Sequence, residues 1–306
     1  MRRWLRAGGR LAQVGAWLLF LLACGTPERS DPQGEAWSRH RQEGLGAFQQ
    51  GRYPEAEASW QQALEIARAF SEQDPRLHRT LEELADLRVV QGQLAGAETL
   101  YVRLLSLQQD NSEPDGKAMA GTLAKLADLY RAQRQLARAE TLYVRLFSFY
   151  QDHSEPGSLG MATTLAKLAD LYRAQGMVAR ADSLDRRALG YKLHAQGRAH
   201  FLQGNDRQAE TFYRQALQIQ ERNLGKDHPD LAPTCADLAR ICQLRGDPEQ
   251  AERLYRRALA IQESAPGQTA GDLPRTLEQL AELCDKTGRA GEAAALAGRA
   301  AALRGK

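Results

Sequence analysis

The chain has 306 residues, of which 43% are hydrophobic and 26% are charged, a composition typical of a globular protein with enough apolar material for a core. This composition excludes a wholly disordered chain, and four cysteines are too few for a scaffold built from disulfides. The formal charge of +3 includes four arginines within residues 1–23. Without these four the charge is −1, so no basic character suited to nucleic acid remains.

The N-terminal segment has the pattern of an export signal. Residues 1–10 are cationic, and residues 11–23 form an apolar run. A helix of this run would be about 20 Å long, which is shorter than the roughly 30 Å hydrocarbon core of a bilayer. We therefore expect residues 1–23 to be a cleaved signal peptide. Residues 24–36 are polar and contain two prolines and two glycines, which predicts a tether.

The end of the apolar run reads Leu21-Leu22-Ala23-Cys24 and resembles the lipobox of bacterial lipoprotein signal peptides. The resemblance implies cleavage before Cys24, a diacylglycerol thioether on its sulfur and acylation of its new amino group. Two or three acyl chains anchor a protein stably to a membrane. Gly25 in place of an aspartate implies the outer membrane of a bacterial envelope. An ordinary secretory signal with an incidental cysteine stays open.

The rest of the chain is one repeating unit. A turn residue, usually glycine, is followed after five positions by a small residue and after four more by an aromatic. The turn residues are separated by 41, 42, 42, 28, 42 and 42 positions, and they are Gly51, Gly92, Arg134, Gly176, Gly204, Gly246 and Gly288. Ahead of each turn, apolar residues at i, i+3 and i+7 predict a further helix with a small residue on its packed face.

Four departures from this pattern mark particular places in the array. Asp185 and Ala297 occupy the aromatic position, and Arg134 stands where the other turns have glycine. The 28-residue step lies across Gly190 and predicts a tighter junction or a bend. We divide the array there, with repeats 1–4 in residues 37–189 and repeats 5–7 in residues 190–306.

The small residue, turn glycine, alanine and aromatic together resemble the tetratricopeptide repeat (TPR). The 42-residue period and the segment LGKDHPDLAPT at 224–234 are similar to the longer repeats of the kinesin light chain class. The resemblance implies an all-α TPR solenoid, a right-handed superhelix of about seven helix pairs with a concave groove lined by first helices. It further implies a protein or peptide partner.

Charged residues recur directly after the small position of the first helices. They are Asp86, Asp128 and Asp170, followed by Arg198 and Arg240, and Arg131 and Arg173 stand three residues beyond two of the aspartates. One hypothesis is a groove, acidic and then basic, that orients a charged peptide. The alternative is that these residues form i,i+3 salt bridges on solvated helices.

The sequence offers no set of residues for catalysis. None of the six histidines is paired at i+3 or i+4, and no HExxH, GxSxG or phosphate-binding loop motif is present. We therefore predict no catalytic residue, metal or cofactor, and no enzyme. Cys235 and Cys242 occupy apolar positions and are expected to be buried thiols. A disulfide between Cys242 and Cys284 stays open.

These observations predict a lipid-anchored, extracytoplasmic scaffold that binds another protein in a bacterial envelope assembly. Two alternatives stay open. The chain could be a structural array that self-associates into a homo-oligomer through its alanine-rich last helix, or a non-catalytic subunit of an envelope enzyme complex. No nucleic-acid partner is expected.

Overall fold

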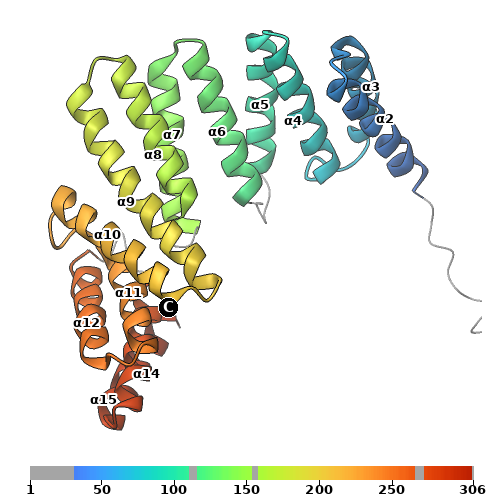
Figure 1. Ribbon diagram of the computed structural model, residues 1–306. Coiled ribbons are helices and arrows are strands. Elements are labelled where there is room, and N and C mark those ends of the chain that lie inside the picture. The colour runs from blue at the N-terminus through green and yellow to red at the C-terminus, as the bar shows by residue number, and fades with distance from the viewer. Residues whose placement is uncertain (1–30, 110–115, 154–157, 266–271, 305–306) are drawn as a thin grey trace, which may run out of the picture. The chain divides into compact units, whose positions relative to one another are not determined.

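The computed structural model describes residues 31–109, 116–153, 158–265 and 272–304 (Figure 1). The signal peptide, Cys24 and the tether up to residue 30 lie outside these residues. The described parts contain helices and no strand, which confirms the all-α prediction. None of the described helices is both long and apolar enough to cross a membrane.

The chain divides into two compact units, residues 1–87 and 88–306. The first contains α2 (Pro32–Gln49), α3 (Tyr53–Ala67) and most of α4 (Pro75–Val90). The helices of the second unit are α5 (Leu94–Gln109), α6 (Gly116–Ala132), α7 (Leu136–His153), α8 (Leu159–Ala174), α9 (Val178–Leu202), α10 (Asp206–Leu224), α11 (Leu231–Leu244), α12 (Pro248–Ser264), α14 (Leu273–Lys286) and α15 (Ala290–Arg304).

The first unit is held by a buried aromatic residue between α2 and α3 and by polar contacts between α2 and α4. The Trp60 side chain of α3 is 2% exposed and lies against Gly44 of α2, where a Cβ atom would be 2.5 Å from the indole ring. Arg41 of α2 and Glu83 of α4 form an ion pair of 2.6 Å, and both side chains are largely buried. The glycine thus lets α2 and α3 approach closely, as the small residue at this position predicts.

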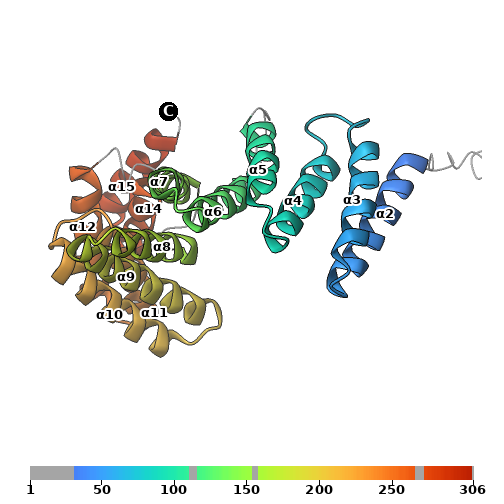
Figure 2. The same cartoon turned by 90° about the horizontal axis from the view of Figure 1, so that it is seen from above.

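The second unit is a stack in which each helix packs on the next one along the chain, from α5 through to α15. The helices can be followed in Figures 1 and 2. Most contacts lie between helices adjacent in the sequence, with a smaller set between α11 and α14, which is typical of a solenoid, so the predicted TPR-like solenoid is confirmed. The superhelical twist of the whole chain stays a prediction.

The repeated positions of the sequence form the core. The small residue and the aromatic of each complete repeat are buried, with exposed fractions of 2% or less. These pairs are Ala56 and Trp60, Ala97 and Tyr101, Ala139 and Tyr143, Ala209 and Tyr213, and Ala251 and Tyr255. The two departures are solvent-accessible, since Asp185 is half-exposed and Ala297 is exposed where the other repeats bury a ring.

The turns between paired helices use the left-handed backbone region. The six turn glycines have φ values between 73° and 80°, a conformation that costs glycine little. Arg134 adopts the same conformation with φ of 62°, and among the described residues no other non-glycine residue has a positive φ. Arg134 thus takes the backbone conformation that glycine provides at the other turns, and this conformation costs a residue with a Cβ about 1 kcal/mol.

The 28-residue step corresponds to a fused helix. The sequence predicted a tight junction or a bend near Gly190, but α9 runs without interruption for 25 residues through it. One helix therefore serves as the second helix of the fourth repeat and the first helix of the fifth. Gly190 permits the close packing, because a Cβ there would lie 2.9 Å from Cγ of the buried Gln220 on α10.

The first helix begins within the segment predicted to be a tether. Helix α2 starts at Pro32, and the Asp31 side chain caps it by accepting a hydrogen bond of 2.9 Å from the Gly34 backbone N–H. Proline suits this first position, because the backbone N–H that it lacks would have no helical partner there. The described structure thus gives residues 32–36 to the helix.

Candidate functional site

The acidic half of the predicted groove consists of aspartates that are already paired. Asp128 of α6 accepts a hydrogen bond of 2.5 Å from the Tyr143 hydroxyl and forms ion pairs with Lys167 and, at 3.8 Å, with Arg131. Asp86 lies half-buried on α4 in the first unit. The i,i+3 pairing that the sequence left open is therefore present at Asp128.

The same pairing occurs one repeat later and involves the residue in the aromatic position. Arg173 of α8 forms an ion pair of 2.8 Å with Asp170 and a second one with Asp185 of α9. All three side chains are more than 40% exposed. Asp185 thus replaces a buried ring with a solvated contact, and the negative charge of this region is locally compensated.

The basic half of the predicted groove opens into a cavity of about 110 Å³ between first helices of the last three repeats. Two residues that the sequence assigned to the groove, Arg198 of α9 and Arg240 of α11, line this cavity. The structure adds Asp237 of α11, Arg275 of α14 and the ring of Tyr213 from α10. Phe201, Leu202, Asp272 and Gln279 are among the other residues of its polar and apolar walls.

The charged side chains around this cavity affect the pKa of the Tyr213 hydroxyl. Burial raises the pKa of Tyr213, and the charge of Asp237 raises it further, whereas Arg198, Arg240 and Arg275 lower it. Among the described residues, no acceptor lies within hydrogen-bond distance of this hydroxyl. The equivalent Tyr143 donates to Asp128, whereas Tyr213 is 1% exposed and contributes to the wall of the cavity.

Arg240 is held at the cavity by an aromatic ring. Its guanidinium carbon lies 4.8 Å from the ring centroid of Phe201, within the range of a cation–π contact. The side chain of Arg240 is exposed and has no hydrogen-bond acceptor among the described residues. The ring therefore orients the guanidinium and leaves its N–H groups available.

Asp237 is the acidic residue of the cavity, and a buried histidine holds it. Nε2 of His194 lies 2.9 Å from Oδ2 of Asp237, and the His194 side chain is 1% exposed. Burial alone would raise the pKa of Asp237, but the His194 hydrogen bond and the charges of Arg275 and Arg198 lower it. Asp237 is therefore ionised at neutral pH.

Sequence reasoning missed His194, Asp237 and Arg275 as a group. A usable signal was present in α11, where Asp237 and Arg240 are the two charged residues of an otherwise apolar and largely buried helix. A charged side chain on such a helix indicates a partner or a site, because burying a charge without a partner costs free energy. Arg275 carried no comparable signal.

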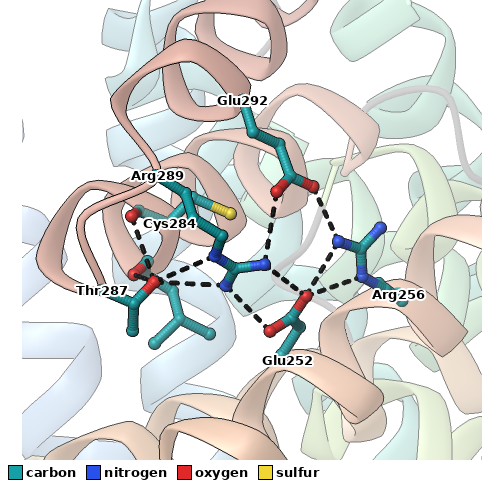
Figure 3. A network of polar contacts seen from close by, with 7 residues as sticks. Glu252, Arg256, Cys284, Thr287, Arg289 and Glu292 are labelled. Atoms are coloured by element: carbon teal, nitrogen blue, oxygen red, sulfur yellow. Dashed lines mark hydrogen bonds and ion pairs between the residues drawn. The ribbon is translucent and has the colours of Figure 1, made fainter.

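A second polar network joins successive repeats at their turns. Glu252 of α12 accepts hydrogen bonds from Arg256 of its own helix and from Arg289 at the turn of the next repeat, both at 2.8 Å, and Glu292 bridges the two arginines (Figure 3). These hydrogen bonds lower the pKa of Glu252 to about 2, so the contacts stabilise the fold above the ordinary carboxyl pKa and are lost as pH falls towards 2.

The same arrangement recurs with different donors. Glu98 and Glu140 follow the small position of their helices and accept from the hydroxyls of Tyr130 (3.1 Å) and Tyr172 (2.5 Å) in the next repeat. The later repeats have Cys242 and Cys284 at that tyrosine position, and turn arginines contact the glutamates instead. This network therefore has a structural role.

The cysteine thiols are suited to packing rather than chemistry. Cys235, Cys242 and Cys284 are free and buried, which confirms the expectation for the first two. Burial raises the pKa of Cys235 to about 12 and also raises that of the other two thiols. A protonated thiol is a poor nucleophile and metal ligand. Within the described residues, no three His, Cys, Asp or Glu side chains are grouped to hold a metal.

Residues 190–264 and 238–306 match the tetratricopeptide repeat. The two TPR matches together span α9–α15 from Gly190 onwards, and thus include every residue of the cavity, although they cover less than half of the chain. The predicted repeats within this part are therefore TPRs. No curated protein matches the chain.

Several solved structures are similar to the whole array. The chain is 24% identical to BtubC (BKLC) from P. vanneervenii over 83% of its length and 91% of that protein's, with a TM-score of 0.36. It is 20% identical to a Podosopora anserina protein with kinesin-light-chain TPR-like repeats, over 78% and 99%, with a TM-score of 0.42. A TPR protein of Parabacteroides merdae is 16% identical over 88% and 93%, with a TM-score of 0.41. These values are too low to support a functional argument.

Proposed function

We propose that this protein is a scaffold that binds a protein or peptide partner through the first helices of repeats 5–7. TPRs generally serve protein–protein interaction rather than catalysis. The observation that carries the proposal is the cavity lined by Arg198, Arg240 and Arg275 together with Tyr213. A lining with three arginines and two aspartates favours a partner with acidic groups.

The proposal also includes a cellular location for the protein. Its support is the lipobox-like sequence ending at Cys24, followed by a polar segment and Gly25. A lipid anchor on Cys24 would hold the TPR array at the outer membrane of a bacterial envelope, outside the cytoplasm. The array would then recruit or organise a component of an envelope assembly.

Partner capture from solubilised envelopes tests the binding site. The full chain is compared with two charge-reversed variants, one at Arg198 and Arg240 and one at Asp128 and Asp170. We expect the basic-half variant to lose partners that the acidic-half variant retains. Identical partner sets for all three proteins would refute the proposed groove.

The Cys24→Ala variant tests the anchor. We expect the parent chain to incorporate labelled palmitate and to sediment with outer membranes, and the variant to do neither. The proposed anchor is wrong if neither form incorporates label and both fractionate alike. Because the binding assay uses solubilised protein, its result does not depend on this one.

Self-association is a second candidate function, and the last helix favours it. Helix α15 buries Ala293 and Ala300, while its outer face exposes further alanines and Leu303, which is 40% exposed. Exposed apolar side chains on one helix face favour association with a second copy. Light scattering after size-exclusion chromatography would show a dimer or larger species, which Leu303→Glu disrupts. A monomer at micromolar concentration would exclude this function.

A further inference from the structure

Three consecutive turns of the second unit carry basic residues and no acidic ones. These turns are the segments 88–96, 130–138 and 172–180, which together form what is here named the turn edge. The turn edge contains six arginines and no aspartate or glutamate, whereas the same segment around every other turn contains at least one acidic residue. Figure 1 shows the three turns along one edge, at the top of the view. The arginines are Arg88, Arg131, Arg134, Arg138, Arg173 and Arg180.

Part of this positive charge is not compensated. Arg134 and Arg180 are exposed, and neither has an acidic side chain within ion-pair distance in the part of the chain that the structure describes. The guanidinium carbon of Arg180 lies 4.6 Å from the ring centroid of Tyr172, so the ring orients this side chain. Arg138 contacts Glu98 at 3.3 Å but is 62% exposed. Arg134 and Arg180 therefore leave an excess of positive charge on the turn edge.

Arg134 occupies a turn at which the backbone favours glycine. Its φ is 62°, whereas the six other turns of this kind have glycine with φ between 73° and 80°. A residue in a strained conformation motivates the search for a functional role, because such residues are concentrated at functional sites. Since the Arg134 side chain is exposed and has no acidic partner among the described residues, we expect it to serve a contact outside the chain.

Apolar side chains are exposed on the same edge. Val89 and Val90 end α4 and are 39% and 50% exposed, and Met177 and Val178 stand at the start of α9 and are 45% and 55% exposed. Arginines beside exposed apolar side chains suit the interface of an anionic bilayer, where the charges meet headgroups and the apolar groups enter the acyl boundary. The lipid anchor proposed on Cys24 would keep the chain near such a surface.

We propose that the turn edge is a membrane-contact surface. Arg134, Arg138 and Arg180 bind anionic phospholipid headgroups, and Met177 and Val178 enter the acyl boundary. The inference goes beyond the partner-binding function and rests on the proposed membrane location. Contact along this edge orients the second unit at the bilayer, which a polar tether alone leaves free to turn.

A fluorescent label on the turn edge tests the proposal in the full chain. The background is Cys24→Ala, in which the other three cysteines are buried. A nitrobenzoxadiazole label is attached to Val178→Cys, and the matched control carries it on Val144→Cys. Val144 is 48% exposed on α7 but lies outside the turn edge. Both chains keep the same N-terminal segment, so any binding through that segment is common to the two.

The labelled chains are mixed with vesicles whose lipids carry brominated acyl chains, which quench a label that reaches them. One set is phosphatidylcholine alone, and the other is an equal mixture of phosphatidylcholine and phosphatidylglycerol. We expect the label at position 178 to be quenched at least about fivefold more on the anionic vesicles than on the neutral ones. The label at position 144 should be quenched on neither. Salt of about 1 M should reverse the quenching at position 178, because it screens the headgroup charge.

Two pairs of substitutions separate the turn edge from general positive charge. Arg134→Gln with Arg180→Gln should lower the quenching at position 178 at least about fivefold. The matched control is Arg103→Gln with Arg145→Gln, which removes the same charge from exposed positions of α5 and α7 outside the turn edge. This control should leave the quenching unchanged.

Equal quenching at positions 178 and 144, equal quenching on both kinds of vesicle, or equal loss in the two arginine pairs would overturn the membrane contact. So would an unquenched label at position 178 together with partners lost from the Arg134 and Arg180 variant in the capture assay, a result that assigns the edge to an acidic protein. The tests of the groove and of the Cys24 anchor use other residues, so a failure of the turn edge is distinguishable from a failure of either.

Discussion

Replacing Gly197 by alanine tests the close helix approach on which the repeat core depends. Gly197 lies in α9, and the equivalent residue is Gly44 in the first repeat and a buried alanine in the other repeats. A Cβ at Gly197 would lie 2.8 Å from Cδ1 of Tyr213, which is nearer than a Cβ atom tolerates. Overpacking of this kind costs about 1–3 kcal/mol. The gain in helix propensity is about 0.5–1 kcal/mol, so we expect a net loss of about 1 kcal/mol in the free energy of unfolding.

The matched control is Gly121→Ala. Gly121 lies inside α6, and nothing lies within 4 Å of the position that its Cβ would take. This variant should gain about 0.5–1 kcal/mol from helix propensity alone. Urea unfolding followed by circular dichroism at 222 nm measures both changes. Equal stabilisation by the two substitutions would show that Tyr213 does not pack against Gly197, and the core argument would fail.

Further substitutions probe three other features. Glu252→Gln should lower the free energy of unfolding by about 1 kcal/mol at pH 6, and by progressively less as pH falls from 4.5 towards 2, because the folded pKa of Glu252 lies near 2. Arg134→Gly should raise stability by about 1 kcal/mol by relieving a φ of 62°, whereas Gly176→Arg should lower it similarly. Arg187→Met should cost about 3 kcal/mol, because it leaves the buried Asp230 without its ion pair of 2.6 Å, and adding Asp230→Asn should restore part of the loss.

Urea titrations check all of these changes. A pH-independent effect of Glu252→Gln would contradict the role of its hydrogen bonds. Destabilisation by Arg134→Gly would show that the arginine side chain makes contacts that outweigh the backbone strain. If the double variant at Arg187 and Asp230 were no more stable than the single one, the loss would come from packing rather than from an unpaired charge.

The repeat core could be predicted because its information is local and periodic. Ala209 and Tyr213, for example, stand at fixed distances from Gly204, and the structure buries both. A small residue beside a ring leaves few ways to pack two helices, so the sequence pattern indicates the geometry. The same periodicity located the first-helix positions of Arg198 and Arg240.

The cavity could be predicted only in part. Arg198 and Arg240 share a repeat position, whereas Asp237 and Arg275 do not, and they meet only because α9, α11 and α14 pack together. The role of His194 depends on a single contact between two helices. Contacts of this kind follow from the three-dimensional packing of side chains, which no spacing along one chain encodes.

The ion pairs of the acidic half could also be predicted only in part, for a different reason. The i,i+3 pairs of Asp128 and Asp170 could be foreseen from helix geometry. Contacts with Lys167 and Asp185 come from neighbouring helices and depend on which rotamer each long side chain adopts. Several rotamers are compatible with the same sequence, so such contacts could not be predicted.

The uninterrupted helix α9 places a constraint on how this array can change. Where a loop separates two repeats, an inserted residue is absorbed by the loop. In a continuous helix each added residue turns everything beyond it by about 100° and shifts it by about 1.5 Å. A one-residue insertion near Gly190 would therefore carry His194 and Arg198 away from α11 while leaving α8 in contact with the first half of the helix. The phase of this one helix sets the alignment between the fourth repeat and the ligand cavity, and length variation should be tolerated at the other repeat boundaries before it is tolerated here.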